Sequence, residues 1–89
     1  MAWSTENIIF NNGDWLVVEL DPNTEDCLRL IISQVGSNFG VEWSVVNTIT
    51  DTTALLPEVG ATFNYDVYIR NKKASESNPI TIAVTRLCS

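Results

Sequence analysis

The sequence alternates most regularly over residues 63–70, which read Phe63-Asn64-Tyr65-Asp66-Val67-Tyr68-Ile69-Arg70. Every odd-numbered side chain in this stretch is aromatic or β-branched, and most of the even-numbered ones are polar. Successive side chains of a β-strand point to opposite faces, so a period of two is typical of a strand with one buried face. We therefore predict a strand over 63–70 with its odd-numbered residues in the core.

The same period of two recurs before and after this stretch. Asn, Gly, Pro and Asp cluster between the alternating segments, where they favour turns, and no segment is long enough for a helical crossover. We predict six or seven strands, over residues 7–10, 15–20, 28–35, 41–49, 53–56, 63–70 and 80–87. Short strands joined by turns indicate an antiparallel β-sandwich, either jelly-roll or immunoglobulin-like. At 89 residues, the chain forms a single domain, residues 1–89.

The alternation also predicts which side chains meet in the core of this domain. We expect Phe63, Tyr65, Val67 and Ile69 to pack against Leu28, Leu30, Trp43, Val45, Ile80 and Ile82. Leu28 and Leu30 share one face of their strand, which places Cys27 on the opposite face. By the same count Cys88 shares the inward face of Ile82, although a bulge in either strand reverses this result. We therefore favour two free thiols or a link between chains through Cys88, and keep a Cys27–Cys88 disulfide as the alternative.

The net charge is −6, with 11 acidic and 5 basic residues, which argues against binding to nucleic acid or to an anionic membrane surface. No stretch is apolar enough to span a membrane, and residues 1–12 lack the basic and apolar regions of a signal peptide. We expect neither membrane insertion nor a cleaved signal. The compartment stays open: the chain is made in the cytoplasm, and a place in an external assembly is compatible with the sequence.

The sequence contains no constellation that is typical of catalysis. Histidine is absent, and the paired acids flank a turn, which leaves no activated base or nucleophile. Residues 21–26 place oxygen ligands at alternate positions, as a calcium loop does, but the spacing is not that of an EF-hand. We interpret this loop as a plain turn. The chain is therefore predicted to be no enzyme and to bind no cofactor or metal.

Three features of the sequence are candidates for contacts with a partner. The leading segment from Trp3 through Ile8 to Phe10 carries one charge, so it is suited to pair with its own sheet or with that of a neighbour. Trp15 and Tyr68 fall on outward positions of their strands and offer an aromatic contact surface together with Trp3. The acidic residues lie mainly before Arg70, whereas Lys72 and Lys73 belong to a basic end that favours head-to-tail contacts.

These features support three hypotheses about function. The leading one is a non-enzymatic, self-assembling structural subunit of a filament, coat or virion-type surface, which associates through an edge strand and complementary charge. The second is a surface module that binds a glycan or another protein. The third is a small acidic inhibitor that mimics nucleic acid, using Asp14, Glu19, Asp21, Glu25 and Asp26.

Overall fold

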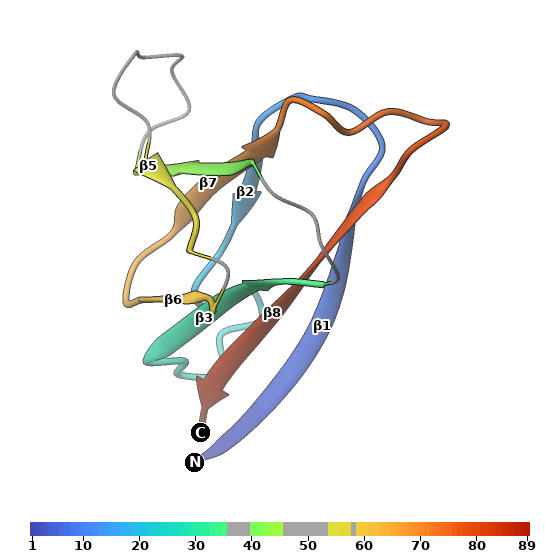
Figure 1. Ribbon diagram of the computed structural model, residues 1–89. Helices are drawn as coiled ribbons and strands as arrows, with labels where there is room; N and C mark the ends of the chain where they lie inside the picture. Colours follow the sequence, from blue (N-terminus) through green and yellow to red (C-terminus); the bar gives the residue numbers. More distant parts are fainter. Residues whose placement is uncertain (36–39, 46–53, 58) are drawn as a thin grey trace.

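The computed structural model describes residues 1–35, 40–45, 54–57 and 59–89 of the chain (Figure 1). These residues form strands and no helix, which confirms the predicted all-β class. The strands are β1 (Ala2–Phe10), β2 (Leu16–Val18), β3 (Arg29–Gln34), β4 (Val41–Ser44), β5 (Ala54–Leu55), β6 (Ala61–Phe63), β7 (Val67–Asn71) and β8 (Ile80–Cys88). Parts of the strands predicted over 28–35, 41–49 and 53–56 match β3, β4 and β5, while residues 46–53 lie outside the described residues.

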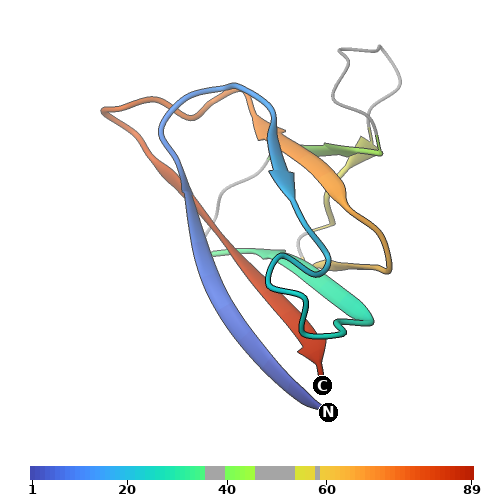
Figure 2. The ribbon, with the colours of Figure 1, turned by 180° about the vertical axis from the view of Figure 1, so that it is seen from behind.

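The strands form two antiparallel sheets, with the orders β1-β8-β3-β6 and β2-β7-β4-β5. Each strand of the first half pairs with its counterpart counted from the end of the chain: β1 with β8, β2 with β7, β3 with β6 and β4 with β5. Two further pairings, β3 with β8 and β4 with β7, complete the sheets. Both views show the long strands β1 and β8 running side by side, with the two chain ends together (Figures 1 and 2).

Side chains from both sheets share one buried hydrophobic cluster. The first sheet contributes Leu30, Ile32, Phe63, Ile80 and Ile82, and the second contributes Val18, Val41, Val67 and Ile69. Trp43 packs against this cluster, and its ring lies 5.0 Å from that of Phe63, edge to face. The prediction is therefore confirmed for most of the expected core residues.

The stretch 63–70 is not one strand, as predicted, but parts of two. β6 ends at Phe63 in the first sheet and β7 begins at Val67 in the second, so the chain changes sheet between them. Tyr65 lies in this connection and is 42% exposed, so its predicted place in the core was wrong. The Asp66 carboxylate accepts a hydrogen bond from the Leu20 backbone N–H at 2.9 Å, which anchors the connection. This split adds a strand to the number expected.

Leu28 and Val45 were also wrongly predicted to be buried, since they are 52% and 56% exposed. Val45 follows the last residue of β4, where the alternation ends. At Leu28 the cause is a bulge: Arg29 is the register partner of Leu87, yet the Leu28 N–H also donates to the Leu87 carbonyl at 2.9 Å. Two residues therefore oppose one, and the alternation shifts by one position before β3.

This shift turns Cys27 inward, where it forms a disulfide with Cys88. Both residues are buried, and neither is a free thiol, which corrects the interpretation that the sequence favoured. The parity count failed because it extended the alternation of β3 across the bulge at Leu28. Next to the disulfide, the Ser89 N–H donates to the Glu25 carbonyl at 3.1 Å. The end of β8 is thus joined to the segment before β3 both covalently and by hydrogen bonding.

The disulfide predicts a large loss of stability in its absence. Its cysteines are 61 residues apart, and closing a loop of that length restricts the unfolded chain by about 4 kcal/mol. We expect the double variant Cys27→Ala, Cys88→Ala to lose free energy of unfolding of this order in urea titrations. When the protein is unfolded in denaturant without a reducing agent, an alkylating reagent should modify neither cysteine. Two alkylated cysteines in every chain would show that the bond does not form.

Candidate functional site

The free edge of β1 is the most extended unpaired backbone that the structure describes. β1 pairs with β8 in an unbroken register, from Ala2 opposite Cys88 to Phe10 opposite Ile80. On its other side no described strand lies against it, as both views show (Figures 1 and 2). β1 has nine residues, whereas the other edge strands, β2, β5 and β6, have three, two and three. An unpaired edge of this length can template another strand.

The two faces of β1 differ sharply in what they offer to a partner. Of the residues singled out in the leading segment, Phe10 is buried and Ile8 is half-buried against the core, so both serve this chain's own packing. Trp3 and Ile9 lie on the outward face and are 50% and 58% exposed. Between them on that face stand Thr5, whose hydroxyl bonds that of Thr85 at 2.9 Å, and Asn7. The outward face of β1 is therefore uncharged and apolar towards its two ends.

The single charge of β1 is neutralised within the chain. The Glu6 carboxylate lies 3.1 Å from the Arg86 guanidinium, whose Nε also donates to the Glu19 carbonyl at 2.9 Å. Arg86 shares the buried face of β8 with Ile82 and Val84. This ion pair was not predicted from the sequence, although a charged residue on an inward position of a strand needs a partner.

The edge of β1 lacks most of the usual devices that prevent pairing between sheets. Natural edges are protected by proline, by lysine, by an inward-pointing charge, by a bulge or by being very short. β1 contains neither proline nor lysine, its register with β8 is continuous, and it is nine residues long. Its one inward-pointing charge, Glu6, is paired with Arg86 of the same chain. This leaves the edge accessible to a further β-strand.

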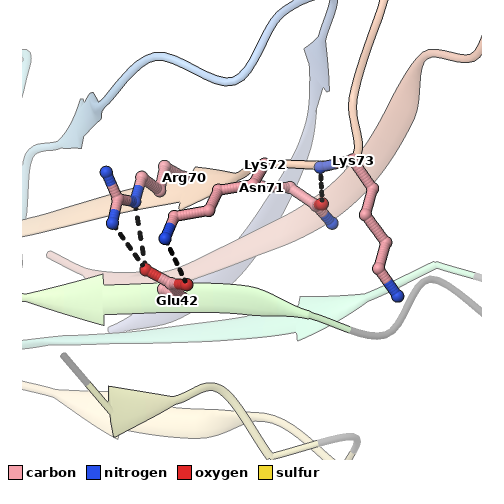
Figure 3. Close-up of polar contacts among 5 residues, drawn as sticks. All are labelled: Glu42, Arg70, Asn71, Lys72 and Lys73. Atoms are coloured by element: carbon pink, nitrogen blue, oxygen red, sulfur yellow. Dashed lines mark hydrogen bonds and ion pairs between the residues drawn. The ribbon is translucent and has the colours of Figure 1, made fainter. Parts of the chain in front are cut away.

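A second polar cluster lies on the outer face of the other sheet, around Glu42 (Figure 3). Glu42 and Arg70 are register partners on β4 and β7, and the guanidinium contacts one carboxylate oxygen through both Nε and an Nη at 3.0 Å. Lys72 lies 3.7 Å from the other oxygen. The Arg70 guanidinium also stacks 4.5 Å from the centre of the Trp15 ring, a cation–π contact. The two basic side chains of this cluster are thus each paired with Glu42 of the same chain.

The aromatic residues proposed as a contact surface do not come together. Tyr68 lies on β7 and is register partner to Val17, so it shares a face of the second sheet with Trp15, whereas Trp3 belongs to the first sheet. Trp15 is half-buried with Arg70 against its ring. The three side chains therefore offer no common stacking platform.

The basic end of the sequence is largely paired with acids of the same chain. Arg70 and Lys72 meet Glu42, and Arg86 meets Glu6. Lys73 is exposed, and its backbone N–H donates to the Asn71 side chain at 2.9 Å (Figure 3). Ion pairs thus balance most of the basic end, while the acidic excess of the sequence remains.

Two hollows formed by described residues are small. One of about 250 Å³ lies beside Phe10 and Trp15, and another of about 80 Å³ lies beside the disulfide. Pockets for small molecules are usually larger, from about 300 to 1,000 Å³. In the loop at residues 21–26, the Asp21 carboxylate accepts a hydrogen bond from the Glu25 backbone N–H at 2.7 Å. The described residues hold no group of three potential metal ligands.

Among the described residues there is also no helix that is long and apolar enough to cross a membrane.

Comparison with known proteins gives no relative: no protein family, no curated protein and no solved structure matches the chain. The function must therefore be inferred from the geometry of this molecule.

The Glu42 cluster predicts that one carboxylate holds two cations in place. Glu42→Gln would leave Arg70, which is 5% exposed, without its counter-charge, so we expect a loss of about 1 to 3 kcal/mol in the free energy of unfolding. Glu76→Gln, at an exposed position, should leave stability unchanged in the same urea titration. Equal stability of the two variants would show that the ion pair contributes nothing.

Proposed function

We propose that this chain is a non-enzymatic structural subunit that self-associates through the free edge of β1, as part of a filament, a coat or a virion-type surface. One observation carries the proposal: a nine-residue edge strand, uncharged on its outward face, lies beside β8 without proline, lysine or a bulge to block further pairing. Strand addition at such an edge supplies backbone hydrogen bonds, which do not depend on a pocket or a charged site.

The finer fold that fits this proposal is an eight-stranded jelly-roll sandwich. The pairing of each strand with its counterpart from the other end of the chain is that of one long hairpin folded over into two sheets. The shared core of the two sheets supports the sandwich. An immunoglobulin-like arrangement would instead pair several strands that follow each other in sequence, whereas only β4 and β5 do so here. Jelly rolls are common in capsids and lectins.

Charge and redox chemistry add secondary support. Among pairs of described residues, Arg29 and Lys73 are the basic side chains without an ion pair, so complementary charge between copies is the smaller contribution. The Cys27–Cys88 disulfide favours a place for the assembled protein outside a reducing compartment. This agrees with an external assembly.

The two other hypotheses have less to support them. A glycan-binding module would need Trp3, Trp15 and Tyr68 to act together, but Trp3 belongs to a different sheet from the other two. A protein-binding module that uses β1 for a foreign strand differs from self-association only in the partner. The acidic inhibitor retains exposed carboxylates such as Glu25 and Asp26, without a complementary geometry that defines a target.

Self-association through β1 predicts that a charge on its outward face will disrupt the assembly. We expect the unmodified protein to form species larger than 9.9 kDa in light scattering at micromolar concentrations. Asn7→Lys should shift it towards the monomer, because two copies would then bring like charges together at the edge. The matched control is Val17→Lys, which adds the same charge at an exposed position of the short strand β2. Circular dichroism should show that both variants remain folded.

Two outcomes would reject the proposal. An unmodified chain that stays monomeric at hundreds of micromolar does not self-associate. An equal effect of Asn7→Lys and Val17→Lys would mean that β1 is not where the copies meet.

A further inference from the structure

We infer that the association takes the form of a two-fold dimer, in which β1 pairs antiparallel with β1 of a second copy. The first sheets of the two copies would then join into one continuous sheet of eight strands. This inference rests on the proposed function and adds the partner strand, its direction and its register.

The lengths of the edge strands indicate which strand of a second copy pairs with β1. The number of hydrogen bonds between two edge strands grows with the number of residues that overlap, and β1 has nine residues. The opposite edge of the same sheet, β6, has three, so a head-to-tail contact of β1 with β6 would leave most of β1 unpaired. β2 and β5 are no longer than β6, with three and two residues. Among the described edges only β1 of a second copy matches, and a contact of a surface with itself closes as a dimer. In a filament or coat, such dimers would therefore meet through a second contact.

Full overlap of the two strands fixes the register. An antiparallel pair of Ala2–Phe10 with itself is centred on Glu6, so Trp3 of one copy lies opposite Ile9 of the partner subunit. Residues that lie directly opposite in an antiparallel pair share a face of the sheet. Trp3 and Ile9 are both on the outward face, where they are 50% and 58% exposed. The dimer therefore covers both exposed apolar side chains of the outward face of β1, once at each end of the strand pair.

β1 carries little of the net charge of the chain. Two copies with a net charge of −6 repel each other, so they approach best where the charge is lowest. β1 carries only Glu6, and Glu6 is held 3.1 Å from Arg86 of its own chain. At the two-fold axis the two Glu6 side chains lie directly opposite each other, and the ion pair of each with its own Arg86 reduces their repulsion. The loop 21–26 forms no strand of this edge, but its Glu25 lines a small hollow together with Ser4 and Glu6 of β1.

Opposite charges introduced at positions 3 and 9, which the register places opposite each other across the dimer, test this register directly. Trp3→Lys and Ile9→Glu should each raise the dimer Kd at least about tenfold, since each sets a charge against an apolar side chain. The double variant Trp3→Lys, Ile9→Glu should recover most of this loss, because each introduced lysine meets an introduced glutamate of the other copy. Six residues of extended strand separate the two positions by roughly 20 Å, so the new charges cannot pair within one chain.

The matched control carries the same charges in the wrong register. In Trp3→Lys, Asn7→Glu the introduced glutamate lies opposite Thr5 of the partner subunit and only diagonally from the introduced lysine, so we expect a clearly smaller recovery. Sedimentation equilibrium gives the Kd values, and 0.5 M salt should reduce the recovery by screening the new pairs. On the unmodified chain, a mixed dimer of isotope-labelled and unlabelled copies should show contacts between the Trp3 indole and the Ile9 methyl groups in isotope-filtered NMR.

The outcomes separate this inference from the proposed function. If the unmodified protein associates but the double variant is as weak as its matched control, or if NMR shows no contact between Trp3 and Ile9, the two-fold register is wrong while self-association stands. If the unmodified protein is monomeric at every concentration, self-association itself fails.

Discussion

The antiparallel pairing of the last strand, β8, with the first strand, β1, is the interaction on which the rest of the structure depends. β8 hydrogen-bonds to β1 on one side and to β3 on the other, and every second side chain along it is buried. Joining the two chain ends brings the inner strands together as counterparts, β2 with β7 and β3 with β6. The same pairing places Cys88 beside Cys27 and leaves β1 at the outside of its sheet.

Alternation in the sequence predicts the fold where a strand stays within one sheet. It identified the all-β class and most of the core, including Leu30, Ile82 and Ile69, which are fully buried. It failed where the backbone departs from a regular ladder. The bulge at Leu28 shifts the alternation and hides the disulfide, and the change of sheet after Phe63 leaves Tyr65 exposed while the apparent period continues. Neither event changes the local pattern of residue types, so local reasoning does not detect it.

The candidate site was predictable in part, for a similar reason. The low charge of the leading segment is a local property, and it pointed to β1 as a strand able to pair. The neutralisation of Glu6 by Arg86 and of Arg70 by Glu42 joins residues that are far apart in the sequence, so the register had to be known first. The basic end therefore mainly stabilises its own chain, and backbone pairing remains the principal means of the association that we propose. Hydrogen bonds between edges are also indifferent to the screening that weakens exposed charge pairs.

Amide hydrogen exchange of the unmodified protein at low and high concentration tests the central claim, that copies meet along the free edge of β1. If copies meet along β1, every second amide of β1, those pointing away from β8, exchanges more slowly at high concentration. The amides of the short edge strands β2, β5 and β6 should keep their rates. Protection that appears in those strands while β1 is unchanged would contradict the account.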